Sequence, residues 1–310
     1  MKRKDFIQNG TMVGAAMLLG LEGISSVFSD NGLTIAKAPD LVAVMGGEPV
    51  LMLEKALASL GGINRYVKKG QSIVIKPNIG WDRPPELSAN TNPQLVGALV
   101  KKCLQAGASK VTVFDNTCDN WQKCYASSGI ANAVKAAGGQ IVPADTEAYY
   151  AEVSLPRGVK LKSTKIHKAL IEADAWINVP VLKNHGGAKI TCCMKNYMGI
   201  VWDRRYFHRN DLPQCIADVC TWTKRPVLNI VDAYRVMRKN GPKGTSAGDV
   251  SVLKTLIASS DIVAADTAAI NFFNQVETMP IESVTYIAKA HALKVGTSDL
   301  SKLNIARIKV

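Results

Sequence analysis

Short runs rich in valine and isoleucine alternate with longer segments of helical periodicity along most of this 310-residue chain. The first two runs, LVAVM at 41–45 and SIVIKPN at 72–78, are each followed by a segment whose apolar residues recur at helical spacing. Strands that alternate with helices of ten or more residues favour a sheet covered on both faces. The sequence therefore predicts an α/β fold: a mostly parallel sheet, helices on both faces, and a site at the C-terminal ends of the strands.

Further strand-like runs follow along the chain, and nothing between them resembles a long flexible linker. They are KVTVFDN at 110–116, QIVPAD at 140–145, AWINVPVLK at 175–183, VLNIVDAY at 227–234 and LNIARIKV at 303–310. The sequence therefore predicts a single α/β domain over residues 30–310.

Residues 1–29 have the pattern of an export signal. Lys2, Arg3 and Lys4 precede an apolar stretch that is too short and too rich in glycine and serine for a membrane span. The segment RKDFIQ resembles a twin-arginine signal in which Lys4 stands at the second arginine position. We therefore expect an exported, periplasmic protein that meets the export machinery and has no stable transmembrane segment once mature. Glu22 interrupts the apolar stretch, which leaves an amphipathic helix of a cytoplasmic protein as the alternative.

The formal net charge of +13 indicates a partner of opposite sign, either nucleic acid or a small anion. The basic residues are scattered, without a basic tract interleaved with aromatics, a zinc-finger spacing or an RNP-like strand. This pattern argues against nucleic acid and favours a small anionic molecule, with a generally basic surface accounting for most of the charge.

The seven cysteines include no C-x-x-C pair and no ferredoxin-like run. The chain therefore has no iron–sulfur motif and no zinc ribbon, and most of its cysteines are expected to be buried hydrophobic residues. The sequence leaves a disulfide between Cys118 and Cys124 as an alternative.

Polar residues stand at or just after the predicted ends of several strands. They are Lys76 and Asn78, Asp115 and Asn116, Lys183 and His185, Asp232, and Asp266. In an open parallel sheet these ends face one crevice, so residues far apart in the sequence are expected to converge there.

The stretch 176–199, WINVPVLKNHGGAKITCCMKNYMG, carries the densest group of such residues. A buried lysine can bind an anion or act as a base, and a neutral histidine can transfer protons. The candidate catalytic residues are Lys183, His185 and Lys195, and the candidate substrate-binding residues are Lys76, Asn78, Asn196 and Gly241. Taken singly, a lysine paired with an aspartate or a structural histidine is an equally ordinary explanation.

Asp115, Asp232 and Asp266 could hold a divalent metal together with His185, or orient the lysines. No H-x-x-x-H or H-E-x-x-H spacing selects an ion, and a strand-end aspartate often caps the following helix instead. Gly241, Pro242 and Gly244 could shape a backbone anion nest, although GPKG is not a P-loop.

Taken together, these segments resemble the bacterial and archaeal domain of unknown function 362 family. The matching motifs are VIKPN at 74–78, AGASKVTVFDN at 106–116, NVPVLKNHGGAKITCCMKNYMG at 178–199, NIVDAYRVMRKNGPKG at 229–244 and SSDIVAADTAA at 259–269. By position, the resemblance implies that the family's polar residues are Lys76, Asn78, Lys183, His185, Lys195, Asn196, Asp232 and Asp266. Some relatives carry a ferredoxin-like segment, whose cysteine motifs are missing from this sequence. The family's name records no settled activity.

Three classes of function remain open from the sequence. The first is an enzyme that acts on a small anionic substrate, with or without the assistance of a metal ion. The second is a noncatalytic anion-binding protein, which a two-lobed body hinged near residues 149–165 would favour. The third is a redox-associated protein, which would need a bound cluster or flavin.

Overall fold

The computed structural model describes residues 38–310, so the export signal predicted over residues 1–29 lies outside the described residues. A sheet of ten strands runs through the described part of the chain, with a separate pair of strands beside it. Pro39–Val310 form one unit by their contacts. None of the helices over residues 38–310 is long and apolar enough to cross a membrane.

The strands of the described residues are β1 (Leu41–Met45), β2 (Ser72–Pro77), β3 (Lys110–Val113), β4 (Gln140–Ile141), β5 (Tyr150–Ser154), β6 (Ser163–His167), β7 (Ala175–Val179), β8 (Val181–His185), β9 (Lys189–Thr191), β10 (Leu228–Met237), β11 (Val250–Ser259) and β12 (Ile305–Lys309). The α-helices are α2 (Pro49–Ser59), α3 (Pro93–Gln105), α4 (Trp121–Ser127), α5 (Ile130–Ala136), α6 (Lys168–Glu172), α7 (Cys193–Asn196), α8 (Arg204–Arg209), α9 (Leu212–Val219), α10 (Ile262–Phe273) and α11 (Thr285–Ala292).

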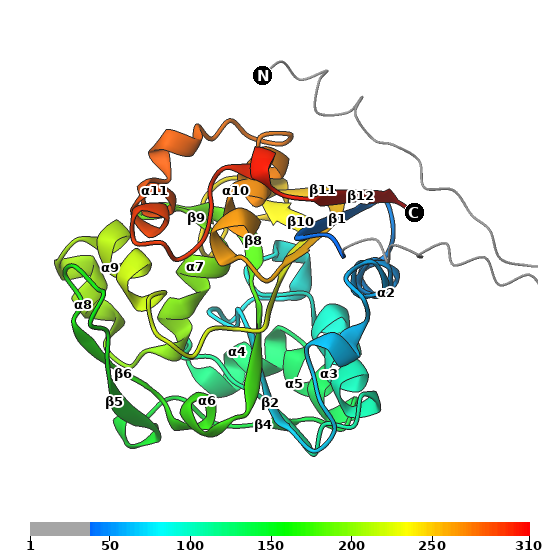
Figure 1. The fold of residues 1–310 in the computed structure, drawn as a ribbon, viewed down its shortest axis with the longest axis horizontal. Coiled ribbons are helices and arrows are strands. Elements are labelled where there is room, and N and C mark those ends of the chain that lie inside the picture. The colour runs from blue at the N-terminus through cyan, green and yellow to red at the C-terminus, as the bar shows by residue number, and fades with distance from the viewer. Residues whose placement is uncertain (1–37) are drawn as a thin grey trace, which may run out of the picture. The chain divides into compact units, whose positions relative to one another are not determined.

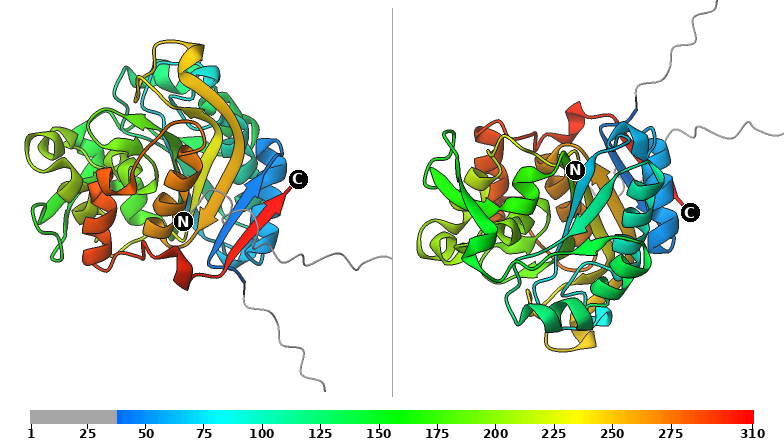
Figure 2. Two further views of the ribbon diagram at one scale, coloured as in Figure 1. Left: turned by 90° about the horizontal axis from the view of Figure 1, so that it is seen from above. Right: turned by 90° about the horizontal axis from the view of Figure 1, so that it is seen from below.

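The main sheet has the order β12-β1-β11-β10-β7-β2-β3-β4, and most of its pairs are parallel. The exceptions are β11, which runs antiparallel to both of its neighbours, and the β8–β9 hairpin. The first and last described strands, β1 and β12, lie side by side at one edge (Figure 1 and Figure 2). The predicted fold class, a mostly parallel α/β sheet with helices on both faces, is confirmed.

Alternate residues of each central strand enter different hydrophobic cores. In β2, Ile73 and Ile75 pack with α2 and α3, whereas Val74 packs on the other side with Trp176. The helices α7, α9, α10 and α11 cover that second face, opposite α2, α3 and α5 (Figure 1). Because side chains of a strand point alternately to the two faces, a sheet buried on both sides needs continuous apolar runs, as the sequence has.

The predicted run 175–183 is not one strand but two. Pro180 has no N–H to donate and separates β7 from β8, and both halves pair in parallel with β10. The carbonyl of Pro180 instead accepts the N–H of Asp232 at 2.9 Å. This break turns β8 and its hairpin partner β9 toward the end of the sheet where the polar residues gather.

The segment at 149–165, which hinted at a domain boundary, forms an antiparallel ribbon of β5 and β6. Its side chains Tyr150, Leu155 and Ile166 belong to the same core as the helices α7 to α11. The described residues therefore contain no second lobe at this place, and the condition that would have favoured a hinged binding protein is not met.

Candidate functional site

A cavity of about 380 Å³ lies at the C-terminal ends of β2, β3 and β8. Its size is that of a pocket for a small molecule. The cavity is lined by Asn78, Gly80, Trp81, Asp115, Asn116, Cys118, Lys183, His185, Thr191, Lys195, Asn196, Met198, Gly199, Arg204, Arg205, His208 and Pro242. The structure thus brings six of the candidate catalytic, substrate-binding and metal-binding residues to one place: Asn78, Asp115, Lys183, His185, Lys195 and Asn196.

Lys183 reaches this cavity from β8 and is only 1% exposed. Its Nζ donates hydrogen bonds to Asn78 Oδ1, at 3.0 Å, and to the carbonyl oxygen of Ala89. Burial lowers the pKa of this amine to about 7, and the neighbouring ammonium of Lys195 acts in the same direction. The two acceptors engage both N–H groups of a neutral amine, so its lone pair remains available for a proton.

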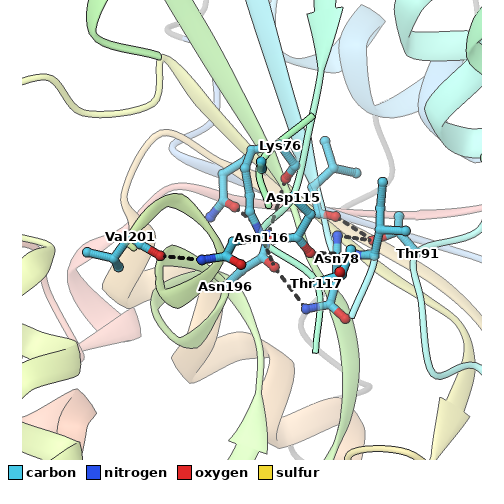
Figure 3. A network of polar contacts seen from close by, with 12 residues as sticks. Lys76, Asn78, Thr91, Asp115, Asn116, Thr117, Asn196 and Val201 are labelled. Atoms are coloured by element: carbon cyan, nitrogen blue, oxygen red, sulfur yellow. Dashed lines mark hydrogen bonds and ion pairs between the residues drawn. The ribbon is translucent and has the colours of Figure 1, made fainter. Parts of the chain in front are cut away.

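Lys76 is not among the residues that line the cavity, but it forms a buried ion pair with Asp115, which is (Figure 3). Its Nζ is 2.8 Å from Asp115 Oδ1 and donates to Asn196 Oδ1 at 2.8 Å. The second carboxylate oxygen of Asp115 accepts the N–H of Ile79 at 2.6 Å. This lysine therefore neutralises the buried carboxylate of Asp115. Its amine is engaged by Asp115 and Asn196 and is not free to bind a ligand.

The amide of Asn196 connects Lys76 to Lys183. Its Oδ1 accepts from Lys76 and also from Asn78 Nδ2, at 3.1 Å, while its Nδ2 donates to Asn178 Oδ1 at 2.8 Å. These bonds fix which end of the Asn78 amide faces Lys183, because the Nδ2 of Asn78 is committed to Asn196. The two asparagines therefore position the Lys183 amine rather than presenting free groups to a ligand.

His185 follows Lys183 and is fixed in one tautomer by the glycine-rich turn after it. Its Nδ1 accepts the backbone N–H groups of Gly187 and Ala188 at 3.1 and 3.0 Å. The proton of the neutral ring must then reside on Nε2. Burial lowers the pKa of His185 far below its ordinary value, and Lys195 and Lys183 lower it further. The ring is thus a neutral hydrogen-bond donor at physiological pH.

Lys195 is half-buried and comes from the short helix α7. The start of this helix is held by Asp266, whose two carboxylate oxygens accept the N–H groups of Cys193 and Met194 at 2.6 and 3.1 Å. Burial lowers the pKa of Lys195 to about 8, and the charge of Arg204 acts in the same direction. Lys195 therefore adds a second amine that is partly neutral near physiological pH.

Arg204, Arg205 and His208 line the same cavity but were not singled out from the sequence. They come from α8, whose first turn is capped by Asp203 through the N–H groups of Arg205 and Tyr206. The guanidinium of Arg204 is fixed by the carbonyls of Asn116 and Thr117, at 2.8 and 2.6 Å. The cluster of basic and aromatic residues in VWDRRYFHRN at 201–210 is the sequence pattern that could have indicated them as site residues.

The three candidate metal-binding carboxylates do not share one site. Asp232 lies inside β10, where it accepts the N–H groups of Asn92 and Tyr234, and Asp266 lies within α10 rather than at a strand end. Asp115 is the one of the three that lines the cavity, and it is paired with Lys76. The described residues therefore do not bring these carboxylates and His185 together as the ligands of one metal.

Among the described residues, the group that could hold a metal consists of Cys192, Cys193 and Asp266, with ligand atoms within 4.8 Å of one another. All three are buried, and burial raises the pKa of the Cys192 thiol to about 12. The oxygens of Asp266 already accept two backbone N–H groups. Thiolates bind metal and thiols do not, so metal binding here would have to displace two protons from the core.

Gly241 and the Cys118–Cys124 pair differ from what the sequence suggested. Gly241 offers no free N–H to an anion, because that N–H donates to Asn184 Oδ1 at 3.1 Å. A Cβ at Gly241 would collide with the carbonyl of Asn184, so glycine serves a close approach of two backbones. Cys118 and Cys124 are both free thiols, and no bridge joins them.

The comparisons with known proteins agree with the motifs. A family model described as Domain of unknown function (DUF362) matches residues 73–271, more than half of the chain. A thylakoid-associated protein of Synechocystis sp. is 24% identical over 228 residues, which cover 71% of this chain and 68% of that protein.

Among solved structures, the lactate racemase apoprotein from Thermoanaerobacterium thermosaccharolyticum is similar at a TM-score of 0.49 and 14% identity. The match covers 76% of this chain and 57% of that chain, so this chain spans little more than half of the racemase's length. Since the family match runs from within β2 to within α10 and includes every polar residue of the motifs, the chain belongs to the family described as Domain of unknown function (DUF362).

Proposed function

We propose that this protein is an enzyme that binds a small anionic molecule in the cavity and transfers a proton to or from it. The observation that carries the proposal is the state of Lys183: it is buried, lines the cavity and has both N–H groups of its neutral form bound to Asn78 and Ala89. An amine held in this way presents its lone pair in a fixed direction, which is what a general base requires.

The charges around the cavity favour an anion. Lys195, Arg204 and Arg205 contribute positive charge, whereas the carboxylate of Asp115 is already neutralised by Lys76. Low-dielectric walls lined by one sign of charge concentrate ligands of the opposite sign. The bound molecule should therefore carry a carboxylate or a phosphate.

His185 complements Lys183 in this proposal. A neutral imidazole with its proton on Nε2 can donate a hydrogen bond to an oxygen that gains negative charge when Lys183 removes a proton nearby. This role differs from a proton shuttle, because the lowered pKa of His185 makes its ring a poor proton acceptor.

A noncatalytic anion-binding protein is the second candidate. Binding alone is served best by an ammonium group that keeps its charge. A fully buried lysine whose pKa falls to about 7 loses much of that charge at physiological pH. This observation favours a catalysed reaction over binding alone.

Export to the periplasm stays a prediction.

Proton transfer can be tested before the natural substrate is known. The purified protein would be incubated in D₂O with pyruvate, lactate or malate, and exchange of the carbon-bound protons next to the carbonyl or carboxylate would be followed by NMR. We expect exchange above the protein-free rate with at least one acid, and a loss of at least about 100-fold in Lys183→Met.

Lys101→Met is the matched control, because Lys101 is an exposed lysine on α3 outside the cavity. It should exchange at the wild-type rate. Equal exchange by Lys183→Met and the wild type would remove Lys183 from the proposal, and no exchange with any of the three acids would contradict proton transfer for small carboxylates.

A further inference from the structure

Lys195 differs from the other two lysines of the site in having no structural partner. Lys76 is paired with Asp115, and Lys183 donates to Asn78 and Ala89. Within residues 38–310, the Nζ of Lys195 takes part in no hydrogen bond or ion pair, although the residue is half-buried and lines the cavity. Its amine is therefore free to react with a bound molecule.

The surroundings of Lys195 favour the nucleophilic, neutral form of an amine. Burial lowers its pKa to about 8, and the positive charges of Arg204 and Lys76 lower it further, against the opposing effects of Cys118 and Asp115. A lysine that is desolvated and lies next to other cations is a known arrangement for attack on carbonyl groups. A lysine that only bound an anion would instead be expected in surroundings that stabilise its charged ammonium form.

The rest of the cavity supplies what a carbonyl substrate needs. The Nε2–H of His185 can polarise a carbonyl oxygen, and Arg204 and Arg205 can balance a carboxylate. A 2-oxo acid carries a carboxylate and a carbonyl on adjacent carbons. We propose that Lys195 forms an imine with the carbonyl carbon of a small 2-oxo acid. This inference rests on the proposed function, since the carboxylate must bind in the same cavity.

The step balances without any further reactant. The lone pair of the neutral Lys195 amine forms a bond to the carbonyl carbon, and the carbonyl oxygen takes up the displaced electron pair. The two protons of the amine leave with that oxygen as one molecule of water, and a C=N bond replaces C=O. Protonation of the imine nitrogen then draws electrons from the imine carbon, which acidifies the protons on the next carbon (C3 of pyruvate) and eases removal of one of them by Lys183.

Reduction with borohydride tests the proposal, because it converts an imine into a stable secondary amine. The full-length protein would be incubated with pyruvate, reduced, and analysed by intact mass and peptide mapping. We expect one pyruvate-derived adduct per chain, located on Lys195. Lactate, which has the carboxylate but no carbonyl, should give none. Lys195→Arg should lose the adduct and Lys101→Arg should keep it.

Calorimetric titration with pyruvate and lactate separates the two proposals. Binding of both acids with an adduct on Lys195 supports both. Binding without an adduct, or an adduct on Lys183 or spread over exposed lysines, overturns the imine and leaves the anion site intact. No binding of either acid overturns both for this class of ligand. Peptide mapping of the wild type locates the adduct even if Lys195→Arg fails to fold.

Discussion

Lys76→Met is expected to lower the free energy of unfolding by about 3–5 kcal/mol, because it leaves the carboxylate of Asp115 buried without its counter-charge. Asp115 is 2% exposed, and the Nζ of Lys76 lies 2.8 Å from its Oδ1. The same change removes one of the two hydrogen bonds accepted by Asn196 Oδ1. Denaturant unfolding of the wild type and the variant measures the loss.

The double variant Lys76→Met with Asp115→Asn distinguishes this cause from a general packing defect. The amide of asparagine carries no charge and can still accept the N–H of Ile79, which Asp115 Oδ2 accepts at 2.6 Å. We therefore expect the double variant to be more stable than Lys76→Met alone. If the stability losses of the two single variants sum to the loss of the double variant, the ion pair does not account for the effect of Lys76→Met.

Gly199→Ala is the second change with a large expected effect. A Cβ at Gly199 would meet Asp115 Oδ1 and the Nζ of Lys76, and would lie 2.7 Å from Lys76 Cε. The added methyl group cannot be accommodated unless the buried ion pair separates, so we expect a loss of at least about 3 kcal/mol in stability. Thermal and denaturant unfolding would measure it.

Gly186→Ala is the matched control for Gly199→Ala. Both glycines belong to the same motif, but a Cβ at Gly186 would meet only the carbonyl of Gly241, at 3.9 Å, which is an ordinary contact. We expect its stability to stay within about 0.5 kcal/mol of the wild type. A loss of the same size in both variants would mean that the motif is sensitive to any substitution, independent of the Lys76–Asp115 pair.

The fold could be predicted from the sequence because its signals are local. Val- and Ile-rich runs indicate the buried strands, and α3 has a proline, Pro93, at its first position and a glycine of positive φ, Gly107, just past its end. The antiparallel insertion of β11 between β1 and β10 could not be predicted, because the direction of a strand depends on contacts distant in the sequence. The break at Pro180 has a local signal, since a proline cannot donate the N–H that a continuous central strand requires.

The site could be predicted in part, for a similar reason. Lys183 and His185 lie in the last half of β8, at the end of a valine-rich run, so the geometry of a parallel sheet places them at its edge. Asp266 was misplaced because the apolar run before it continues into α10, and a strand end cannot be told from a buried helix by hydrophobicity alone. Arg204 and Arg205 enter the cavity from a helix that no strand precedes directly, so strand ends gave no indication of them.

The supporting network could not be predicted at all from local pattern. Asn196 joins Lys76 to Asn78, and through Asn78 to Lys183, across 120 residues of sequence. Which amide oxygen faces which amine depends on three-dimensional placement. The structure shows that two asparagines assigned to substrate binding are engaged with protein groups and hold Lys183 in position.

The amine of Lys183 is expected to be neutral near physiological pH, and an NMR titration of protein labelled with ¹³C at the lysine Cε positions tests this directly. Burial disfavours the charged form, so the folded-state pKa is depressed. We predict one lysine resonance that titrates near pH 7 and is missing in Lys183→Met, and another near pH 8 that is missing in Lys195→Met. If every lysine resonance titrates near pH 10.4, the ordinary value, Lys183 is charged at physiological pH and cannot serve as the base.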